Sequence, residues 1–184
     1  EVSGDFYDVI RITDEKIAVA MVDVSGHGVP SALLTSMIKT EIDNQLKRET
    51  DPAIVCTNIN QNLRYTLSET GFYCTMVLCV IDLSKMEIEY SNCGHTSPIY
   101  IKNDGRIETL TTDGFFIGTP LEATYEKKRV AVSPGDRIFF YTDGLIEARG
   151  ANGDLFGEAR FIELIQETKS LGVETQLNAI LSRI

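Results

Sequence analysis

The strand-like segments of this chain are separated by turns too short to carry a parallel crossover. Residues 6–12 and 16–24 are rich in apolar and β-branched side chains, and only Thr13-Asp14-Glu15 lies between them. A parallel connection needs about a dozen residues or more, so these two segments are expected to form an antiparallel hairpin. The sequence therefore predicts antiparallel strands. Further pairs of apolar runs flank short turns at 72–82 and 86–92, at 97–101 and 106–110, and at 125–132 and 137–141.

Helical periodicity appears in two pairs of segments. After Gly28, apolar residues recur every three or four positions, and Asp51-Pro52 opens a second stripe that ends before Gly71. Residues 157–168 and 174–184 show the same patterning. Paired helices need a sheet face to cover, so we predict an α+β sandwich of antiparallel sheet with helices packed outside. The expected apolar stripe of the first helix is Val29, Leu33, Leu34, Met37, Ile38, Ile42 and Leu46.

Size and charge narrow the class of protein. The chain has 184 residues, of which 43% are apolar, as in one soluble globular domain. No run approaches the ~18 apolar residues of a membrane-spanning helix, and the start does not resemble a signal peptide, so we expect a cytoplasmic domain without membrane contact. Seventeen basic and 27 acidic side chains give a net charge of −10, which disfavours nucleic-acid binding.

The four cysteines carry no metal or redox signature. Cys56, Cys74, Cys79 and Cys93 form no CxxC pair, and the chain has only two histidines to complete a zinc site. Three of the four lie in apolar or strand-like stretches. We therefore predict reduced thiols within the core.

Three aspartates follow or flank apolar strands beside a glycine. Asp23 comes directly after residues 17–22, Asp143 follows residues 138–141, and Asp5 precedes the first strand. Because the predicted hairpin reverses near Asp14, about nine residues from both Asp5 and Asp23, these two acids are expected at the same end of the hairpin.

Carboxylates gathered in this way suit a hard divalent cation. Mg²⁺ and Mn²⁺ take oxygen ligands, and a glycine beside each acid permits a tight turn and the approach of a main-chain carbonyl, for which Val24 is the candidate. Two ions bridged by one Asp would generate a hydroxide nucleophile suited to a phosphomonoester. The alternative for any single acid is an ordinary Asp-Gly turn. Three aspartates together favour a metal site, because carboxylates that lie close together repel one another unless they are protonated or neutralised by cations.

Four motifs resemble the bacterial branch of the metal-dependent type 2C (PPM) serine/threonine phosphatases, the SpoIIE-like and stress-response regulator group. The similarity runs from residue 2 to about residue 165, with the motifs in the family's order and spacing. The motifs are Ser-Gly-Asp-Phe-Tyr-Asp at 3–8, Asp-Val-Ser-Gly-His-Gly-Val-Pro-Ser-Ala-Leu at 23–33, Asn-Cys-Gly-His at 92–95 and Tyr-Thr-Asp-Gly-Leu-Ile-Glu-Ala-Arg at 141–149.

The resemblance implies an αββα four-layer sandwich, with two antiparallel sheets flanked by helices and two Mn²⁺ or Mg²⁺ ions at one end. Asp23 would bridge the ions, the backbone carbonyl of Val24 and the carboxylate of Asp143 would complete their shells, and Asp5 would coordinate directly or through water. The implied activity is protein serine/threonine phosphatase, by attack of a metal-activated water. The implied substrate is a phosphorylated STAS-type regulatory protein, an anti-sigma-factor antagonist in bacterial signal transduction.

Two departures from the family pattern bear on the metal set. The chain has Ser3-Gly4-Asp5 where the family usually has Gly-Gly-Asp, and it reaches Ile184 without the family's Asp-Asp-(Ile/Met)-Thr segment. We therefore expect residues 1–184 to be a single domain and a fragment lacking the first strand and the last metal-ligand strand, with a possible N-terminal sensor or regulatory domain in the full-length chain. The alternative function is a catalytically weak or inactive partner-binding regulatory module of the same fold.

Other residues near the motifs leave alternatives open. His27 is a candidate general acid for the leaving oxygen, or a ring that hydrogen-bonds nearby backbone groups. His95 is expected as a packed, hydrogen-bonded turn residue, and Asp8 as a group that orients the site or replaces Asp5 as a ligand. The loop at 111–121 either borders the substrate groove or inserts its aromatic side chains into the core.

Overall fold

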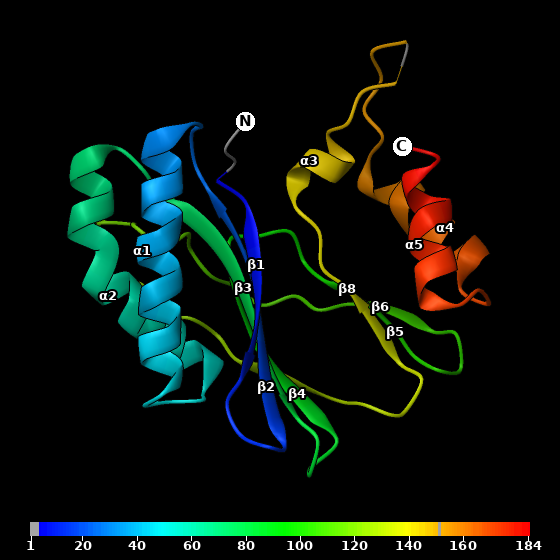
Figure 1. Cartoon of the computed structure of the whole chain (residues 1–184), viewed down its shortest axis with the longest axis horizontal. Helices are drawn as coiled ribbons and strands as arrows, with labels where there is room; N and C mark the ends of the chain where they lie inside the picture. Colours follow the sequence, from blue (N-terminus) through cyan, green and yellow to red (C-terminus); the bar gives the residue numbers. More distant parts are fainter. Residues whose placement is uncertain (1–3, 151) are drawn as a thin grey trace.

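Two antiparallel sheets lie between two layers of helices (Figure 1). The computed structural model describes residues 4–150 and 152–184, so Ser3 of the first predicted motif lies outside the described residues. The helices cover the outer faces of the sheets, and the inner faces pack against each other. The predicted αββα sandwich is confirmed.

The first sheet contains the predicted hairpin. Phe6 pairs with Val22 and Arg11 pairs with Ile17, so the chain reverses where the short turn predicts. All neighbouring strands are antiparallel. In spatial order the strands are β1 (Phe6–Arg11), β2 (Lys16–Val24), β3 (Cys74–Asp82), β4 (Glu87–Cys93) and β7 (Lys128–Ala131).

The second sheet has the spatial order β6 (Ile107–Thr109), β5 (Ile99–Ile101) and β8 (Arg137–Phe139). The predicted pairing of 125–132 with 137–141 is wrong, because β7 pairs with β4 and β8 pairs with β5. Each strand thus completes an edge of a different sheet, and the turn at 133–136 crosses between the sheets. Asp136 fixes this crossing by accepting hydrogen bonds from the backbone N–H groups of Ser133 and Asn103.

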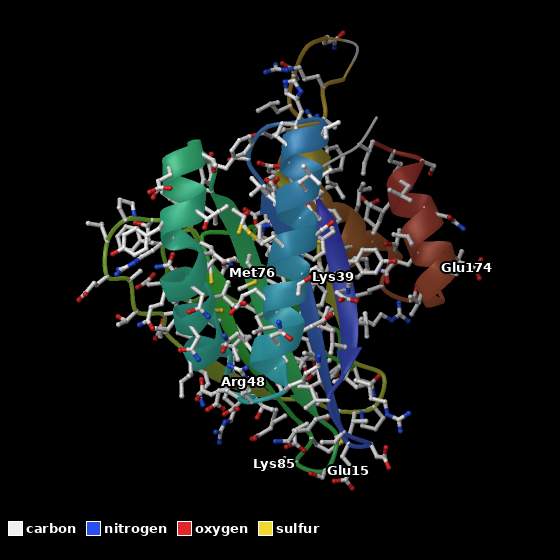
Figure 2. All side chains as sticks on the ribbon, turned by 60° about the vertical axis from the view of Figure 1, so that its left-hand side comes forward. Glu15, Lys39, Arg48, Met76, Lys85 and Glu174 are labelled. Atoms are coloured by element: carbon white, nitrogen blue, oxygen red, sulfur yellow. The ribbon has the colours of Figure 1, made fainter. Side chains whose placement is uncertain are left out.

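Helices α1 (Val29–Leu46) and α2 (Pro52–Thr70) pack together over the first sheet, as Figure 2 shows from a second side. Asp51 caps α2 by accepting from the N–H of Ala53 at 3.0 Å, and Gly71 ends it with φ of 73°. Helices α4 (Glu158–Thr168) and α5 (Val173–Leu181) cover the second sheet, and α3 (Asp143–Ile146) is a single turn. None of the helices in the described ranges is long and apolar enough to cross a membrane.

The buried face of α1 differs from the predicted stripe in its first turns. Val29 and Leu33 are both 68% exposed, whereas Ser31 is fully buried. The Thr35 hydroxyl lies within hydrogen-bond distance of the Gly4 carbonyl, at 3.3 Å. Small polar residues therefore share the packed face with Leu34 where α1 passes the start of β1.

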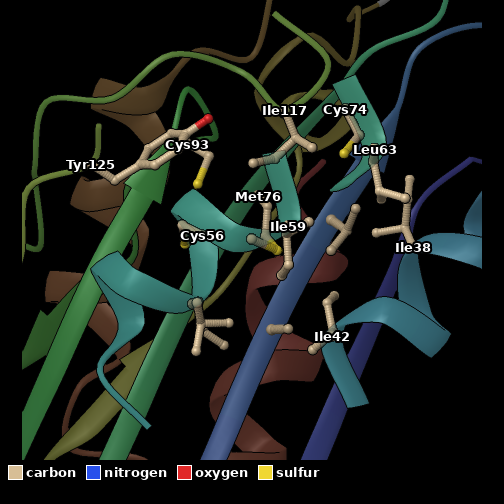
Figure 3. Close-up of a cluster of buried hydrophobic side chains, with 14 of the residues drawn as sticks. Ile38, Ile42, Cys56, Ile59, Leu63, Cys74, Met76, Cys93, Ile117 and Tyr125 are labelled. Carbon is tan, nitrogen blue, oxygen red and sulfur yellow. The ribbon is translucent and has the colours of Figure 1, made fainter. Parts of the chain in front are cut away.

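The core between the helices and the first sheet holds three of the four cysteines (Figure 3). Cys56, Cys74 and Cys93 are fully buried there, and Cys79 lies between the two sheets. Burial raises the pKa of the Cys74 and Cys79 thiols, which keeps them protonated. The prediction of free core thiols is confirmed.

Candidate metal centre

The β1–β2 hairpin brings Asp5 and Asp23 together. Asp5 precedes Phe6, which pairs with Val22, so Asp5 stands across from Asp23. The backbone N–H of Val24 donates to the carbonyl of Gly4 at 3.3 Å and continues the pairing beyond the strand. The carboxyl groups of Asp5 and Asp23 share a hydrogen bond. The predicted neighbourhood of these two acids is therefore present.

Gly4 permits the close approach of the Val24 carbonyl. A Cβ atom at position 4 would lie 2.3 Å from the Val24 oxygen, so any side chain there would displace the backbone. The fold therefore requires glycine at position 4, beside Asp5, because no side chain fits there. The arrangement keeps the Val24 carbonyl next to the two acids, where the sequence predicts an oxygen donor.

Asp143 comes from the other side of the sandwich. The sequence places it at a strand end, but β8 ends at Phe139 and Asp143 is the first residue of α3. Figure 1 shows α3 and the start of β1 at the same end of the two sheets. The Thr96 hydroxyl donates to the Tyr141 carbonyl and ties the segment before Asp143 to the loop after β4. The charge of Asp143 contributes to the raised pKa of Asp23, so the third predicted acid lies within electrostatic range of the first two.

Burial and the neighbouring acids both shift the titration of Asp23. Burial, the hydrogen bond with Asp5 and the charges of Asp5 and Asp143 together raise the pKa of Asp23 from 3.8 to about 7. A carboxyl group in such surroundings holds a proton or is neutralised by a cation. Without a cation, the protein must accommodate this concentration of negative charge at neutral pH.

The donors are all oxygen atoms, which suits Mg²⁺ or Mn²⁺. In the part of the chain that the structure describes, no three His, Cys, Asp or Glu side chains are already grouped so that they could hold a metal ion. The residues fit a divalent ion by the chemistry of their oxygen donors, and the acidic side chains would have to come closer together to bind it.

Thr75 and His95 form a hydrogen-bonded pair next to Asp23 that the sequence pattern did not predict. Thr75 pairs with Asp23 across β2 and β3, and its hydroxyl lies 2.8 Å from Nδ1 of His95. The backbone N–H of His95 donates to Asn92 at 2.7 Å, as expected for a packed turn residue. Burial lowers the pKa of His95, so its ring is neutral at pH 7. Only the strand register reveals Thr75, because a threonine within a strand carries no signal of its own.

Asp8 and His27 lie apart from the three acids. Asp8 forms an ion pair with Lys39 of α1, which lies over β1 in Figure 2. Alternation along β1 places Asp8 on the helix-facing side and Asp5 on the opposite side, so Asp8 does not replace Asp5. His27 is exposed in the turn before α1. No described residue hydrogen-bonds its ring, so its general-acid role stays a prediction.

Comparison with known proteins agrees with the fold. The family described as Stage II sporulation protein E (SpoIIE) matches residues 13–184. The phosphoserine phosphatase RsbU of Bacillus subtilis (strain 168) is 29% identical over 156 residues, which cover 84% of this chain and 46% of RsbU. The chain spans less than half the length of the curated relatives that it matches.

Solved structures show the same architecture. The SiaA-PP2C domain of Pseudomonas aeruginosa superimposes with a TM-score of 0.86 at 25% identity, over 99% of this chain and 73% of that chain. RsbX, solved in complex with magnesium, superimposes with a TM-score of 0.72 at 17% identity, over 99% of this chain and 80% of that chain. The similarity therefore extends over nearly all of the sandwich.

Proposed function

This chain belongs to the SpoIIE family of PP2C-type domains, and on that premise we propose that it is a metal-dependent protein serine/threonine phosphatase. The observation that carries the proposal is the cluster of Asp5, Asp23 and Asp143, in which the pKa of Asp23 is raised to about 7. The name of RsbU, a phosphoserine phosphatase, supports the same reaction.

The residues of the cluster have distinct roles in this proposal. Asp23, Asp5, Asp143 and the Val24 carbonyl would hold the Mn²⁺ or Mg²⁺ ions, with Asp23 as the ligand common to both ions that the motif resemblance implies. When bound, such ions lower the pKa of a water toward neutrality and supply the nucleophile for attack on phosphorus. Thr75 and His95 support the strand end that carries Asp23 and so keep its carboxyl group in place.

The proposed substrate is phosphoserine or phosphothreonine on a bacterial regulatory protein of the STAS type, acted on in the cytoplasm. This finer assignment rests on the motif resemblance, and RsbU and RsbP, which are both named phosphoserine phosphatases, are consistent with it. A sensor or regulatory domain elsewhere in the full-length protein would control the activity.

One experiment separates this function from a partner-binding module without turnover. Phosphate release from p-nitrophenyl phosphate and from a phosphoserine peptide is measured with Mn²⁺ and then with excess chelator. We expect release from both substrates with Mn²⁺, loss of release on chelation, and no release by Asp23→Asn. Asp8→Asn is the matched control, because Asp8 is also a β1–β2 hairpin-region carboxylate but faces α1. Release that persists in chelator or in Asp23→Asn contradicts the proposal.

A further inference from the structure

Two aromatic side chains lie exposed beside the candidate centre. Tyr73 is 44% exposed and Phe116 is 37% exposed, and their ring centroids are 4.8 Å apart with an interplanar angle of 47°. We call Tyr73 and Phe116 the aromatic pair. Together the two rings present an apolar surface to water. An apolar side chain of a binding partner can cover that surface.

The aromatic pair is held rigidly. Cys74 and Ile117 exchange two backbone hydrogen bonds of 3.0 and 2.8 Å, and Ile117 is fully buried. The N–H of Gly118 donates to the side chain of Asn60 at 2.9 Å within the core. The loop at 111–121 therefore anchors Ile117 in the core and leaves Phe115 and Phe116 at the surface, so the alternative that its aromatic side chains insert into the core is wrong.

Strand alternation places the aromatic pair on the same face as Asp23. Val24, Cys74 and Ile117 all belong to the core under α1 and α2. Because successive side chains point to opposite faces, the residues flanking these three point away from the helices. Asp23, Tyr73 and Phe116 are such neighbours, so all three lie on the face that carries the candidate centre.

The strand register also gives the distance between the backbones of Asp23 and Phe116. Asp23 pairs with Thr75, and the antiparallel bridge between Cys74 and Ile117 sets Phe116 beside Thr75. Two strand spacings of about 4.8 Å put the backbone of Phe116 about 10 Å from that of Asp23. Extended polypeptide covers about 3.5 Å per residue, so this span corresponds to about three residues.

Tyr73 is fixed to the turn that follows Asp23. The N–H of Tyr73 donates to the Ser25 hydroxyl at 3.0 Å, and the N–H of Ser25 donates to the Tyr73 carbonyl at 2.9 Å. Phe116 in turn lies against Gly94, since a Cβ at Gly94 would lie 3.4 Å from the Phe116 nitrogen. The aromatic pair is thus continuous with both strand ends that border the centre.

We propose that the aromatic pair selects polypeptide substrates by contacting an apolar side chain two or three residues from the phosphorylated serine or threonine. This inference rests on the proposed phosphatase function and adds a specificity contact to it. The favoured occupant is an extended polypeptide segment. A nucleic acid is disfavoured by the net charge of −10.

The test uses phosphoserine peptides in an alanine background, with one leucine moved through the three positions on either side of the phosphoserine. Wild type is expected to prefer a leucine two or three residues away by about tenfold in kcat/KM. Tyr73→Ala and Phe116→Ala should each remove most of this preference and leave hydrolysis of p-nitrophenyl phosphate within about twofold of wild type. Tyr65→Ala, at a tyrosine 65% exposed on α2, is the control and should retain the preference.

Circular dichroism confirms that each variant is folded, and Phe116→Leu and Tyr73→Phe retain apolar bulk and should retain the preference. A wild type that hydrolyses all peptides equally, or alanine variants that keep the preference, overturns the aromatic-pair proposal alone. If wild type hydrolyses neither the peptides nor p-nitrophenyl phosphate, the proposed function is overturned, and the specificity contact is overturned with it.

Discussion

Replacement of Asp23 by asparagine should stabilise the metal-free protein at neutral pH. The folded state raises the pKa of Asp23 from 3.8 to about 7, so it holds the Asp23 proton more tightly than the unfolded state does. A group of this kind lowers stability as the pH rises from about 4 to about 7, because the proton is released into unfavourable surroundings. Asparagine keeps the shape of the side chain and removes the charge.

The expected gain in stability follows from the raised pKa of Asp23. About three pKa units at about 1.4 kcal/mol each set a ceiling of about 4 kcal/mol. Asp23 is only partly buried, and solvent screening reduces the expected gain to about 1 to 2 kcal/mol. In a domain of this size that gain corresponds to an increase in Tm of about 2 to 8 °C.

Thermal unfolding in excess chelator at pH 5 and pH 8 measures this effect. Wild type should lose stability between the two pH values, and Asp23→Asn should be more stable than wild type at pH 8, with a smaller difference at pH 5. Asp8→Asn is the control. This substitution breaks the ion pair with Lys39, so it should not raise the Tm. A flat wild-type profile, or an Asp23→Asn variant no more stable than wild type at pH 8, would refute the electrostatic reasoning.

Three further changes test the surroundings of the centre. Gly4→Ala should lower the Tm measured by calorimetry, because its Cβ would lie 2.3 Å from the Val24 oxygen; an unchanged Tm would mean that the backbone there is free to move. Asn60→Ala should cost about 1 to 3 kcal/mol in chemical denaturation by leaving the buried N–H of Gly118 unpaired, and equal stability would show another partner for that group. If His27 protonates the leaving oxygen, His27→Gln should slow phosphoserine-peptide hydrolysis about a hundredfold and spare p-nitrophenyl phosphate, whereas equal effects on both would exclude that role.

The sequence predicts those parts of the fold that depend on local constraints. The three-residue turn at 13–15 leaves no room for a crossover, so the first hairpin and the meeting of Asp5 with Asp23 follow from spacing. The cap at Asp51 and the stop at Gly71 likewise define α2 from its own residues. These features depend little on the rest of the chain.

Features set by distant neighbours could not be predicted in the same way. The turn at 133–136 looks like a hairpin, but the open edges of β4 and β5 decide where β7 and β8 pair. Ser31 is fully buried on α1, and the Thr35 hydroxyl one turn further lies within hydrogen-bond distance of the Gly4 carbonyl, neither of which the periodicity reveals.

The surroundings of the centre show the same limit. Asp143 follows an apolar run but begins a helix, and Thr75 and Phe116 gain their importance only from the register across the strands. The acids of the centre are visible in the sequence, whereas the residues that surround them are not.

Calorimetric titration of the chelator-treated protein with Mn²⁺ tests the central claim most directly, because it asks whether Asp5, Asp23 and Asp143 hold divalent cations without reference to any substrate. Wild type and Asp8→Asn are expected to bind Mn²⁺ saturably, and Asp23→Asn is expected to lose that binding. Mn²⁺ binding by Asp23→Asn equal to that of wild type, or no saturable binding by wild type, would contradict the assignment of this cluster as the metal centre.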